Sequence, residues 1–294
     1  MSRFYIPPSA IRGKSFVLSG SEARHALHVL RKKVGDEIDL FDGKDASYKG
    51  RIDSVASREI RGTILENLPP KSLSIQVTLF QALAKGPKWE WLLEKACEIG
   101  VTRIVPVLTQ RTLIKLDASQ AREKLKRWNR IALAASKQCG RADLLTVEAP
   151  LALSKAFQSL DKNDLSLIPW EKESNRSIHE ACQISPSPQP STEKGEGDSI
   201  EAPSPLRGRG SDTQQSLASC VASKGEGAAV VNVFIGPEGG WDPAEIELAV
   251  RSHVVPVRLG PTLLRTETAG LVAATLVLRE FGVYGPLPLD RPIS

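Results

Sequence analysis

Two glycine-bearing turns near the carboxyl end of the 294-residue chain are the segments best suited to do chemistry. The first, residues 235–241, reads IGPEGGW, and the second, residues 259–269, reads LGPTLLRTETA. Glycine lacks a Cβ atom, so its backbone can approach a ligand closely and can adopt positive φ. The same turns carry charged side chains that could orient a substrate or move a proton, namely Glu238, Arg265 and Glu267. They therefore predict a ligand cleft that also holds ionisable groups.

The elements around the turns indicate how the cleft is built. Each turn follows an apolar run that we expect to be a strand, over residues 230–235 and 254–259. Asp242 and Glu245 then flank a proline in the pattern of a helix start, which predicts a helix to about residue 252. Ligands of open α/β sheets bind at the carboxyl ends of strands. One such turn alone is more simply a structural feature, but two at adjacent strand ends predict a shared pocket.

Other familiar signatures are missing from the sequence. No strand-like run is followed by GxGxxG, and neither GxxxxGK[ST] nor GxSxG occurs, which excludes a dinucleotide fingerprint, a P-loop and a serine-hydrolase elbow. Histidines and cysteines do not combine at metal-ligand spacing, so no metal site is expected. The cysteines are far apart, which favours free thiols in a reducing cytosol over disulfides. They are Cys97, Cys139, Cys182 and Cys220.

The composition is that of a globular protein that could meet a polyanion. Hydrophobic residues make up 41% and charged residues 25% of the chain, no apolar run is long enough to span a membrane, and the N-terminus lacks the apolar stretch of a signal peptide. We expect a cytoplasmic protein without a membrane segment.

The positive charge is concentrated in the first part of the chain. Residues 1–170 carry 28 Lys and Arg against 18 Asp and Glu, whereas the rest carries 11 Lys and Arg against 16 Asp and Glu. The basic part suits a polyanion held away from the two turns, although a solvated lysine-rich surface explains it equally well.

Two domains are expected. Residues 1–72 contain short strands punctuated by turns, which predict a small β-barrel with one helix starting at Ser21, and Pro69-Pro70 marks its end. From residue 73 onward strands alternate with helices, which predicts an α/β domain with a mostly parallel sheet covered on both faces. Its expected elements are strands over 75–80, 103–108 and 164–169 and helices over 87–99, 119–138, 242–252 and 266–281.

An insertion over about 172–228 interrupts the second domain. Its central part, residues 185–212, contains no Val, Phe, Trp, Tyr or Met. Such a segment cannot bury enough apolar area to offset an ordering entropy of about 1–2 kcal/mol per residue, so we expect a disordered surface loop. An RGG-like RNA-binding arm is the alternative, but the repeat over 207–210 is short and the insertion is net acidic.

The chain resembles the SPOUT, or α/β-knot, RNA methyltransferases, and among them the RsmE type, which methylates uracil N3 in ribosomal small-subunit RNA. The resemblance rests on the two turns and on further motifs, and it covers nearly the whole chain except about 172–228. Family members usually have a short connection there, so the insertion adds length without removing a motif. The further motifs are Arg3-Phe-Tyr, His25 with Val29-Leu30-Arg31, Gly35-Asp36, Leu40-Phe41-Asp42-Gly43, and 82–109 with Lys85, Glu94-Lys95, Glu98-Ile-Gly100 and Pro106.

The resemblance implies a SPOUT-like, mostly parallel sheet with a C-terminal trefoil knot, preceded by a PUA-like β-barrel that helps to hold RNA. It also implies a homodimer that binds S-adenosyl-L-methionine in the knot, and burial of the strongly apolar last helix against a second subunit agrees with that. The implied cofactor ligands lie in the two turns and at the start of a third loop near Glu171. They are Ile235, Gly236, Pro237, Gly239, Gly240, Leu259, Gly260, Leu263, Leu264, Thr266, Thr268 and Pro169.

The implied reaction is methyl transfer to uracil N3, whose weakly acidic proton must leave or whose anion must be stabilised. We expect Arg265 to orient the target nucleotide, with an ion pair to Glu267 or a cap of the loop as equal alternatives. Glu238 or Glu267 could assist deprotonation. Contacts with ribosomal RNA are expected from five basic residues, each of which could equally be a solvated surface residue. These are Arg3, Arg12, Arg24, Arg31 and Lys85.

Two other functions remain open at this point. One is a SPOUT methyltransferase that acts on another RNA. The other is a non-catalytic RNA-binding protein of ribosome assembly with a dead pocket, which binding of S-adenosylmethionine would exclude.

Overall fold

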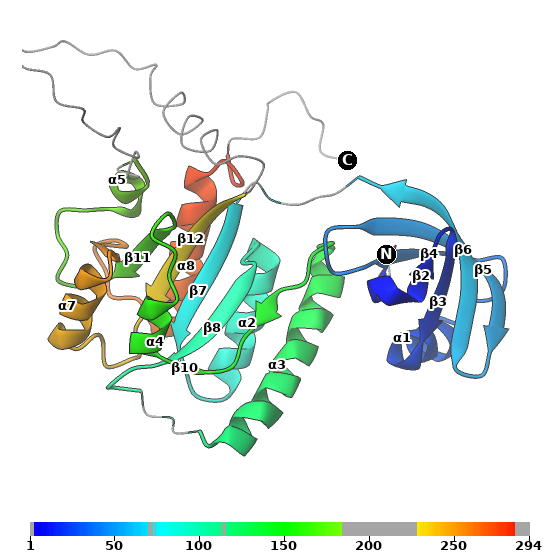
Figure 1. Cartoon of the computed structure of the whole chain (residues 1–294), viewed down its shortest axis with the longest axis horizontal. Helices are drawn as coiled ribbons and strands as arrows, with labels where there is room; N and C mark the ends of the chain where they lie inside the picture. Colours follow the sequence, from blue (N-terminus) through cyan, green and yellow to red (C-terminus); the bar gives the residue numbers. More distant parts are fainter. Residues whose placement is uncertain are drawn as a thin grey trace, which may run out of the picture.

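The structure is a computed structural model that describes residues 3–69, 73, 75–112, 114, 116–183 and 228–285. These residues form two units, a β-rich one and a larger α/β one, which lie side by side in Figure 1. The stretch over 185–212, for which the sequence predicts disorder, lies outside the described residues, as does Cys220.

The N-terminal unit is a six-stranded sheet in the order β1-β4-β5-β6-β3-β2. Only β1 and β4 pair in parallel, and the other neighbours are antiparallel. Alternation of side chains builds its core: in β3, Phe16 and Leu18 are buried while Ser15 and Ser19 are exposed. The elements are β1 (Arg3–Tyr5), η1 (Pro8–Ala10), β2 (Ile11–Arg12), β3 (Ser15–Ser19), α1 (Gly20–Arg24), η2 (His25–Val29), β4 (Glu37–Phe41), β5 (Ser47–Ala56) and β6 (Glu59–Leu68).

The helix of this unit does not start as the sequence suggested. It begins at Gly20 with Ser19 in the cap position and no side-chain cap hydrogen bond, so the prediction of a cap at Ser21 is wrong. Gly20 has a φ of +66°, a conformation that glycine adopts at little cost, and this lets the chain turn from β3 directly into the helix. The helix then widens into the π-helix η2.

The second unit contains a seven-stranded sheet whose paired strands all run parallel. Its order is β10-β8-β7-β12-β11-β13, and β9 pairs with β8. The central strands are almost wholly buried, as expected for a parallel sheet covered on both faces. The strands are β7 (Ile75–Ala82), β8 (Arg103–Leu108), β9 (Thr146–Val147), β10 (Leu151–Ala152), β11 (Leu165–Pro169), β12 (Ala229–Ile235) and β13 (Val255–Val257), so the last one is shorter than predicted.

Helices cover both faces of this sheet, each over its own apolar core. One face carries α2, α3, α5 and α8, with Trp89 against Trp128 at 5.2 Å between ring centroids. The other carries α4 and α7, with stacked Phe80 and Phe234 beneath them. The helices are α2 (Pro87–Ile99), α3 (Ala118–Cys139), α4 (Leu153–Gln158), α5 (Ile178–Gln183), α7 (Pro243–Arg251) and α8 (Thr266–Glu280).

Local signals placed most helix ends correctly. Asp242 accepts from the Ala244 amide and Glu245 accepts from the Asp242 amide, which is the predicted capping box of α7. Gly100 has a φ of 104° and ends α2 as predicted. A second capping box at Asp117, which sequence reasoning missed, starts α3.

Residues 172–183, which the sequence analysis assigned to the insertion, are part of the folded structure. Residues 178–183 form α5, and its Ile178, Ala181 and Cys182 are buried in the core shared with α8. Disorder is therefore the wrong prediction for this part, because these apolar side chains do find a surface to pack on.

A polar contact joins the two units at the end of α3. The Arg3 guanidinium donates to the Gly140 carbonyl, to the Arg141 carbonyl at 2.9 Å and to Ser47 Oγ at 2.8 Å. Lys137 of α3 forms an ion pair of 2.9 Å with Glu22 of α1. Because side chains of both units meet here, the end of α3 is fixed to the β-rich unit.

Candidate functional site

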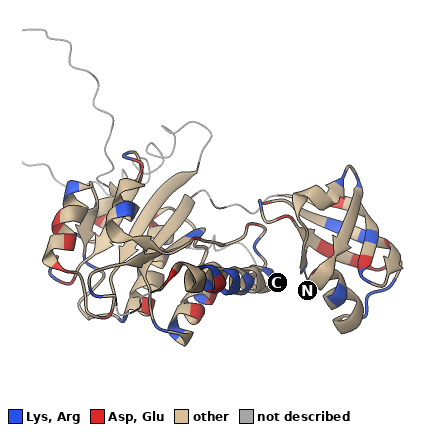
Figure 2. Cartoon of the chain, turned by 60° about the horizontal axis from the view of Figure 1, so that its bottom comes forward, with Lys and Arg blue, Asp and Glu red and all other residues tan. Residues whose placement is uncertain are grey.

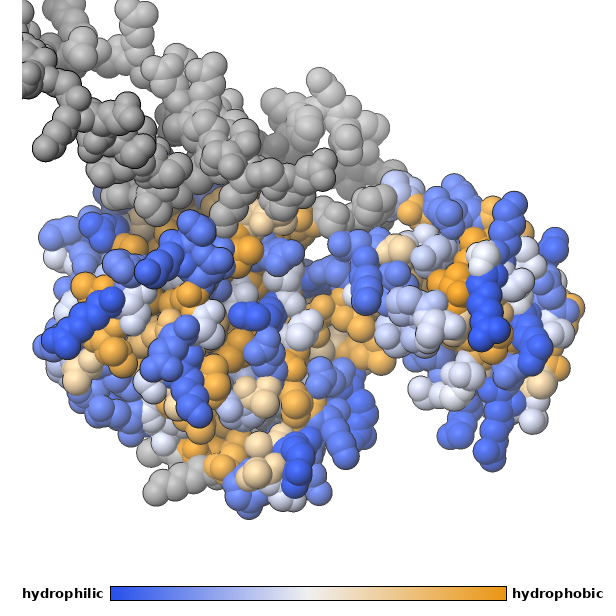
Figure 3. Space-filling view, viewed as in Figure 1, coloured by the Kyte–Doolittle hydropathy of each residue, from blue (hydrophilic) through white to orange (hydrophobic). Residues whose placement is uncertain are grey.

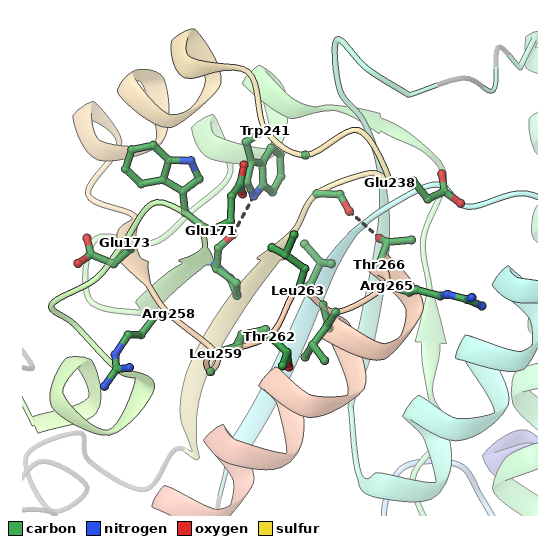
Figure 4. A pocket seen from close by; sticks show the side chains of 18 of the residues that line it. Glu171, Glu173, Glu238, Trp241, Arg258, Leu259, Thr262, Leu263, Arg265 and Thr266 are labelled. Carbon is green, nitrogen blue, oxygen red and sulfur yellow. Dashed lines mark hydrogen bonds between the residues drawn. The ribbon is translucent and has the colours of Figure 1, made fainter.

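Both glycine turns line one cavity of about 580 Å³, as the sequence predicted. The cavity lies at the carboxyl ends of β11, β12 and β13, and the loop that follows Pro169 forms its third wall (Figure 4). This is the edge at which parallel α/β sheets bind ligands. A volume of this size is typical of a site for a small molecule.

The cavity contains most of the predicted ligands. All of the predicted cofactor residues line it except Thr268, which lies on α8 outside the lining. Glu238 and Arg265 line it, whereas Glu267 does not. Four further lining residues lie within the two predicted turns but were not named as ligands, namely Trp241, Pro261, Thr262 and Ala269. Lining residues outside those turns that were not named as ligands are Trp170, Glu173 and Arg258.

The first turn is held in place by tight packing. Gly240 has a φ of 68°, and its amide donates to the Pro237 carbonyl at 2.9 Å. A Cβ atom on Gly236 would lie 3.1 Å from the buried ring of Trp241, whose Nε1 donates to the Pro169 carbonyl at 3.0 Å. A side chain at position 236 would therefore press on the Trp241 ring, which would have to shift by a few tenths of an ångström, and the hydrogen bond of Trp241 holds the first loop against the third.

A buried hydrogen-bond chain joins the first turn to the second. Thr266, the first residue of α8, donates to the Gly236 carbonyl at 2.5 Å. Gln81, at the end of β7, donates to Thr266 Oγ1 at 2.8 Å. Gln81 has no solvent exposure. The sequence offered one weak signal for it, since Gln81 is the polar residue nearest the carboxyl end of this strand, which also contains Gln76 and Thr78.

The second turn is more open than the first. Leu263 has 86% of its surface exposed although it is a large apolar residue, and it borders the cavity. Gly260 has an ordinary φ, and no protein atom lies within 4 Å of a Cβ built there. The protein alone does not require glycine at 260, so any need for a small residue there comes from a ligand.

One group of charged side chains lies at the side of the cavity nearest α2. In Figure 4 the side chains of Glu238 and Arg265 both extend away from the cavity toward α2. Lys88, in the first turn of α2, lies 3.4 Å from Glu238 and 3.6 Å from Glu267. The Glu267 side chain is 10% exposed, and its Oε2 has no hydrogen-bond partner among the described residues. Lys88 was not anticipated, because nothing in the sequence links it to residues 150 or more positions away.

The loop after β8 supports the first turn from outside. Arg111 donates to the Gly239 carbonyl at 2.8 Å and pairs with Asp242 at 3.2 Å. The buried Glu245 carboxylate accepts from the Gln110 amide at 2.9 Å as well as from its own cap residue. Further along the chain this loop leads into α3, which begins at Ala118.

The predicted RNA ligands divide into two groups. Arg3 is part of the contact between the two units, and burial lowers its pKa. Arg12, Arg24 and Arg31 are exposed on the β-rich unit, and Lys85 is exposed just before α2. Arg31 has a φ of 54°, which is unusual for a residue other than glycine, asparagine or aspartate and here follows the π-helix.

Three further features concern metal ligands, cysteines and membrane helices in the part of the chain that the structure describes. They contain no group of three His, Cys, Asp or Glu side chains that could hold a metal ion. Cys97, Cys139 and Cys182 are free, with 4.0 Å between the Sγ atoms of the first two. None of the helices described here has the length and apolar character needed to cross a bilayer.

Comparison with known families gives two matches. A model described as an RNA methyltransferase domain matches residues 71–191 and 208–278. A model described as an RNA methyltransferase PUA domain matches residues 18–65, within the β-rich unit. The cavity therefore falls in a segment that matches methyltransferases.

Similar proteins carry related names. Ribosomal RNA small subunit methyltransferase E of Bacillus subtilis is 27% identical over 264 residues, which cover 90% of this chain and 89% of the relative. The enzyme of that name from Neisseria gonorrhoeae, solved bound to S-adenosyl methionine, aligns with a TM-score of 0.71 and 26% identity over 97% of this chain and all of its own. A putative methyltransferase from Legionella pneumophila in complex with the same cofactor gives 0.70 and 26%, over 94% and 96% of the two chains.

Proposed function

The chain belongs to the RNA methyltransferase family, and from that premise we propose that it methylates N3 of a uridine in small-subunit (16S) ribosomal RNA with S-adenosyl-L-methionine as the methyl donor. The observation that carries this proposal is the single cavity shared by the two glycine turns and the third loop. The names of the relatives and the cofactor bound in two structural neighbours support the choice of substrate and donor.

The cavity suits this cofactor, which supplies an electrophilic methyl group when bound. Leu263 and Leu264 border the cavity and would contact the adenine ring. Main-chain groups of residues 235–240 and 259–263 would hold its polar parts, with Gly260 allowing close approach. Pro169 and the loop after it close the remaining side. Recognition through backbone groups needs no buried charge and agrees with a mainly neutral pocket.

Glu267 is our candidate for the group that takes the N3 proton. Its carboxylate is nearly buried, Lys88 lies beside one oxygen, and the other oxygen has no donor among the described residues. Glu238 is the other candidate, but it is exposed. Arg265 and Lys88 would stabilise the negative charge that develops on the base.

The β-rich unit would hold the RNA outside the pocket. Arg12, Arg24 and Arg31 are exposed there and can reach phosphates, and the family description of this unit agrees with an RNA-related role. Arg3 would act indirectly by fixing the unit to the end of α3. We place the enzyme in the cytoplasm with its ribosomal substrate.

We further propose a homodimer and a trefoil knot. A single chain buries only one side of α8: Ala273, Ala274, Val277 and Leu278 are buried, whereas Leu271, Val272 and Leu276 are only half-buried. A second subunit would cover the half-buried side, which carries Leu271, Val272 and Leu276. For the knot, β13 pairs with β11 at the sheet edge while α8 packs back on β7 and β12, which is a return path compatible with threading.

Two measurements test the function. Titration calorimetry should detect S-adenosylmethionine binding in the micromolar range, and no binding at high micromolar cofactor would favour a non-catalytic assembly protein instead. Mass spectrometry of ribosomal RNA from a strain lacking the gene should show loss of N3-methyluridine. If that nucleoside persists at its normal level while the purified protein binds the cofactor, another RNA is the substrate.

A further inference from the structure

We infer that the solvent face of α3 is a docking track for the backbone of the RNA substrate. This inference rests on the proposed function and adds the surface that the RNA follows between the β-rich unit and the cavity. It depends on the charge of α3, on its pairing and on its position between the two ends of the site.

The charge of α3 stands out against the rest of the chain. The helix contains six Lys and Arg residues and one acidic residue, Glu123, so its formal charge is +5. The whole chain also carries +5, so all the other residues together are neutral. In Figure 2 the positions of Lys and Arg, drawn in blue, recur along this helix on the side of the α/β unit that approaches the β-rich unit.

Most of these cations have no acidic partner. Arg127 pairs with Glu90 of α2, and Lys137 pairs with Glu22. Among the described residues, no carboxylate lies within ion-pair distance of the other four, and all four are exposed. The four are Arg122, Lys124, Lys126 and Arg130.

Three of them form a row on one side of the helix. Arg122, Lys126 and Arg130 are spaced four residues apart, so they lie one above another about 6 Å apart along the axis. They lie opposite the face on which Trp128 and Ala132 are buried. Like charges at this spacing cost an isolated helix about 0.2–0.5 kcal/mol per pair. A polyanion along the row would turn that repulsion into attraction.

The position of α3 matches such a track. Its start follows the loop that holds the first turn through Arg111, and its end is bound by Arg3 of the β-rich unit. Twenty-two helical residues span about 33 Å, so the helix extends over that length from the end of this loop to the contact with the β-rich unit. In Figure 3 the surface is hollowed between the two units, which leaves room for a strand of RNA.

The test is the salt dependence of RNA binding by full-length protein. We would compare wild type with the triple variant Arg122→Gln, Lys126→Gln, Arg130→Gln, using small-subunit ribosomal RNA transcribed in vitro. Each phosphate contact adds about 0.7–0.9 to the slope of log K against log salt, so the triple variant should lose about 2–3 from that slope. Its affinity for S-adenosylmethionine and its circular dichroism should be unchanged.

A matched control removes three exposed cations elsewhere, through Lys155→Gln, Lys162→Gln and Arg251→Gln, and should keep the wild-type slope. If the triple variant and the control bind RNA with the wild-type slope, the inference is wrong while the proposed function stands. If wild-type protein binds the cofactor but shows no salt-dependent binding of this RNA, both the track and the substrate are wrong.

Discussion

Gln81 donates a hydrogen bond of 2.8 Å to Thr266, a residue 185 positions further along the chain, and both side chains are buried. Thr266 passes the interaction on to the Gly236 carbonyl. The end of β7, the start of α8 and the first glycine turn are thereby held together behind the cavity. This contact positions both cofactor turns although Gln81 does not line the cavity itself.

Replacing this donor should loosen the pocket. Gln81→Leu leaves Thr266 without its donor in a buried position, a loss of about 1–3 kcal/mol. We expect a lower Tm and weaker binding of S-adenosylmethionine by calorimetry. The control is Gln76→Leu, on an exposed position of the same strand, which should change neither quantity by much. Equal behaviour of the two variants would show that the contact does not position the turns.

Gly270→Ala tests the same region by steric conflict. A Cβ atom at this position would lie 2.5 Å from Gln81 Oε1. Since the glutamine is buried and hydrogen-bonded, it cannot move away freely, and overpacking of this kind costs about 1–3 kcal/mol. Thermal unfolding should show a lower Tm. A variant as stable as wild type would mean that Gln81 has room to shift.

Gly260→Ala should separate ligand binding from folding. No protein atom lies within 4 Å of the added methyl group, and the backbone φ is one that alanine can adopt. The Tm of the free protein should therefore stay within about 1 °C of wild type, because nothing in the protein is displaced. If the cofactor approaches the backbone here, its dissociation constant should rise, which calorimetry would measure. Unchanged affinity would place the cofactor away from this turn.

Glu267→Gln should slow methyl transfer without weakening cofactor binding. Loss of a positioned general base lowers the rate by about 10²–10⁴-fold. The measurements are single-turnover methylation of RNA and the dissociation constant of S-adenosylmethionine. Glu238→Gln is the comparison, and we expect a smaller loss because that carboxylate is exposed. If Glu238→Gln lowers the rate of methyl transfer more than Glu267→Gln does, Glu238 rather than Glu267 is the group that takes the proton.

Cys139 should react with alkylating agents at lower pH than an ordinary thiol. A hydrogen bond from Cys97 and the nearby Arg141 lower the pKa of Cys139, although burial acts in the opposite direction. Its thiolate therefore forms at lower pH than that of an ordinary cysteine. Iodoacetamide labelling followed by peptide mass spectrometry should reach half its maximal rate at a lower pH for Cys139 than for a free cysteine in a peptide, and a midpoint at or above that of the peptide would contradict this. Cys182 is the internal control, because burial raises its pKa to about 12 and it should remain unlabelled at neutral pH.

The two glycine turns and most of their flanking elements could be predicted because their signals are local. The capping box at Asp242 and the helix stop at Gly100 depend on residues a few positions apart, and both are confirmed. Strand β7 and the parallel sheet followed from apolar runs that alternate with helical patterns. Where a local signal was weak, as at Ser21 and over 178–183, the prediction was wrong.

The sequence by itself therefore determined which segments turn, which form strands and helices, and which two turns share a pocket. Only the tertiary structure brought Gln81 to Thr266 and Lys88 to Glu267, and only it turned Arg3 toward the end of α3. The physical reason is that backbone preferences act between neighbours in the chain. Contacts across 100 residues or more depend on strand order and helix packing, which follow from burial of the whole core.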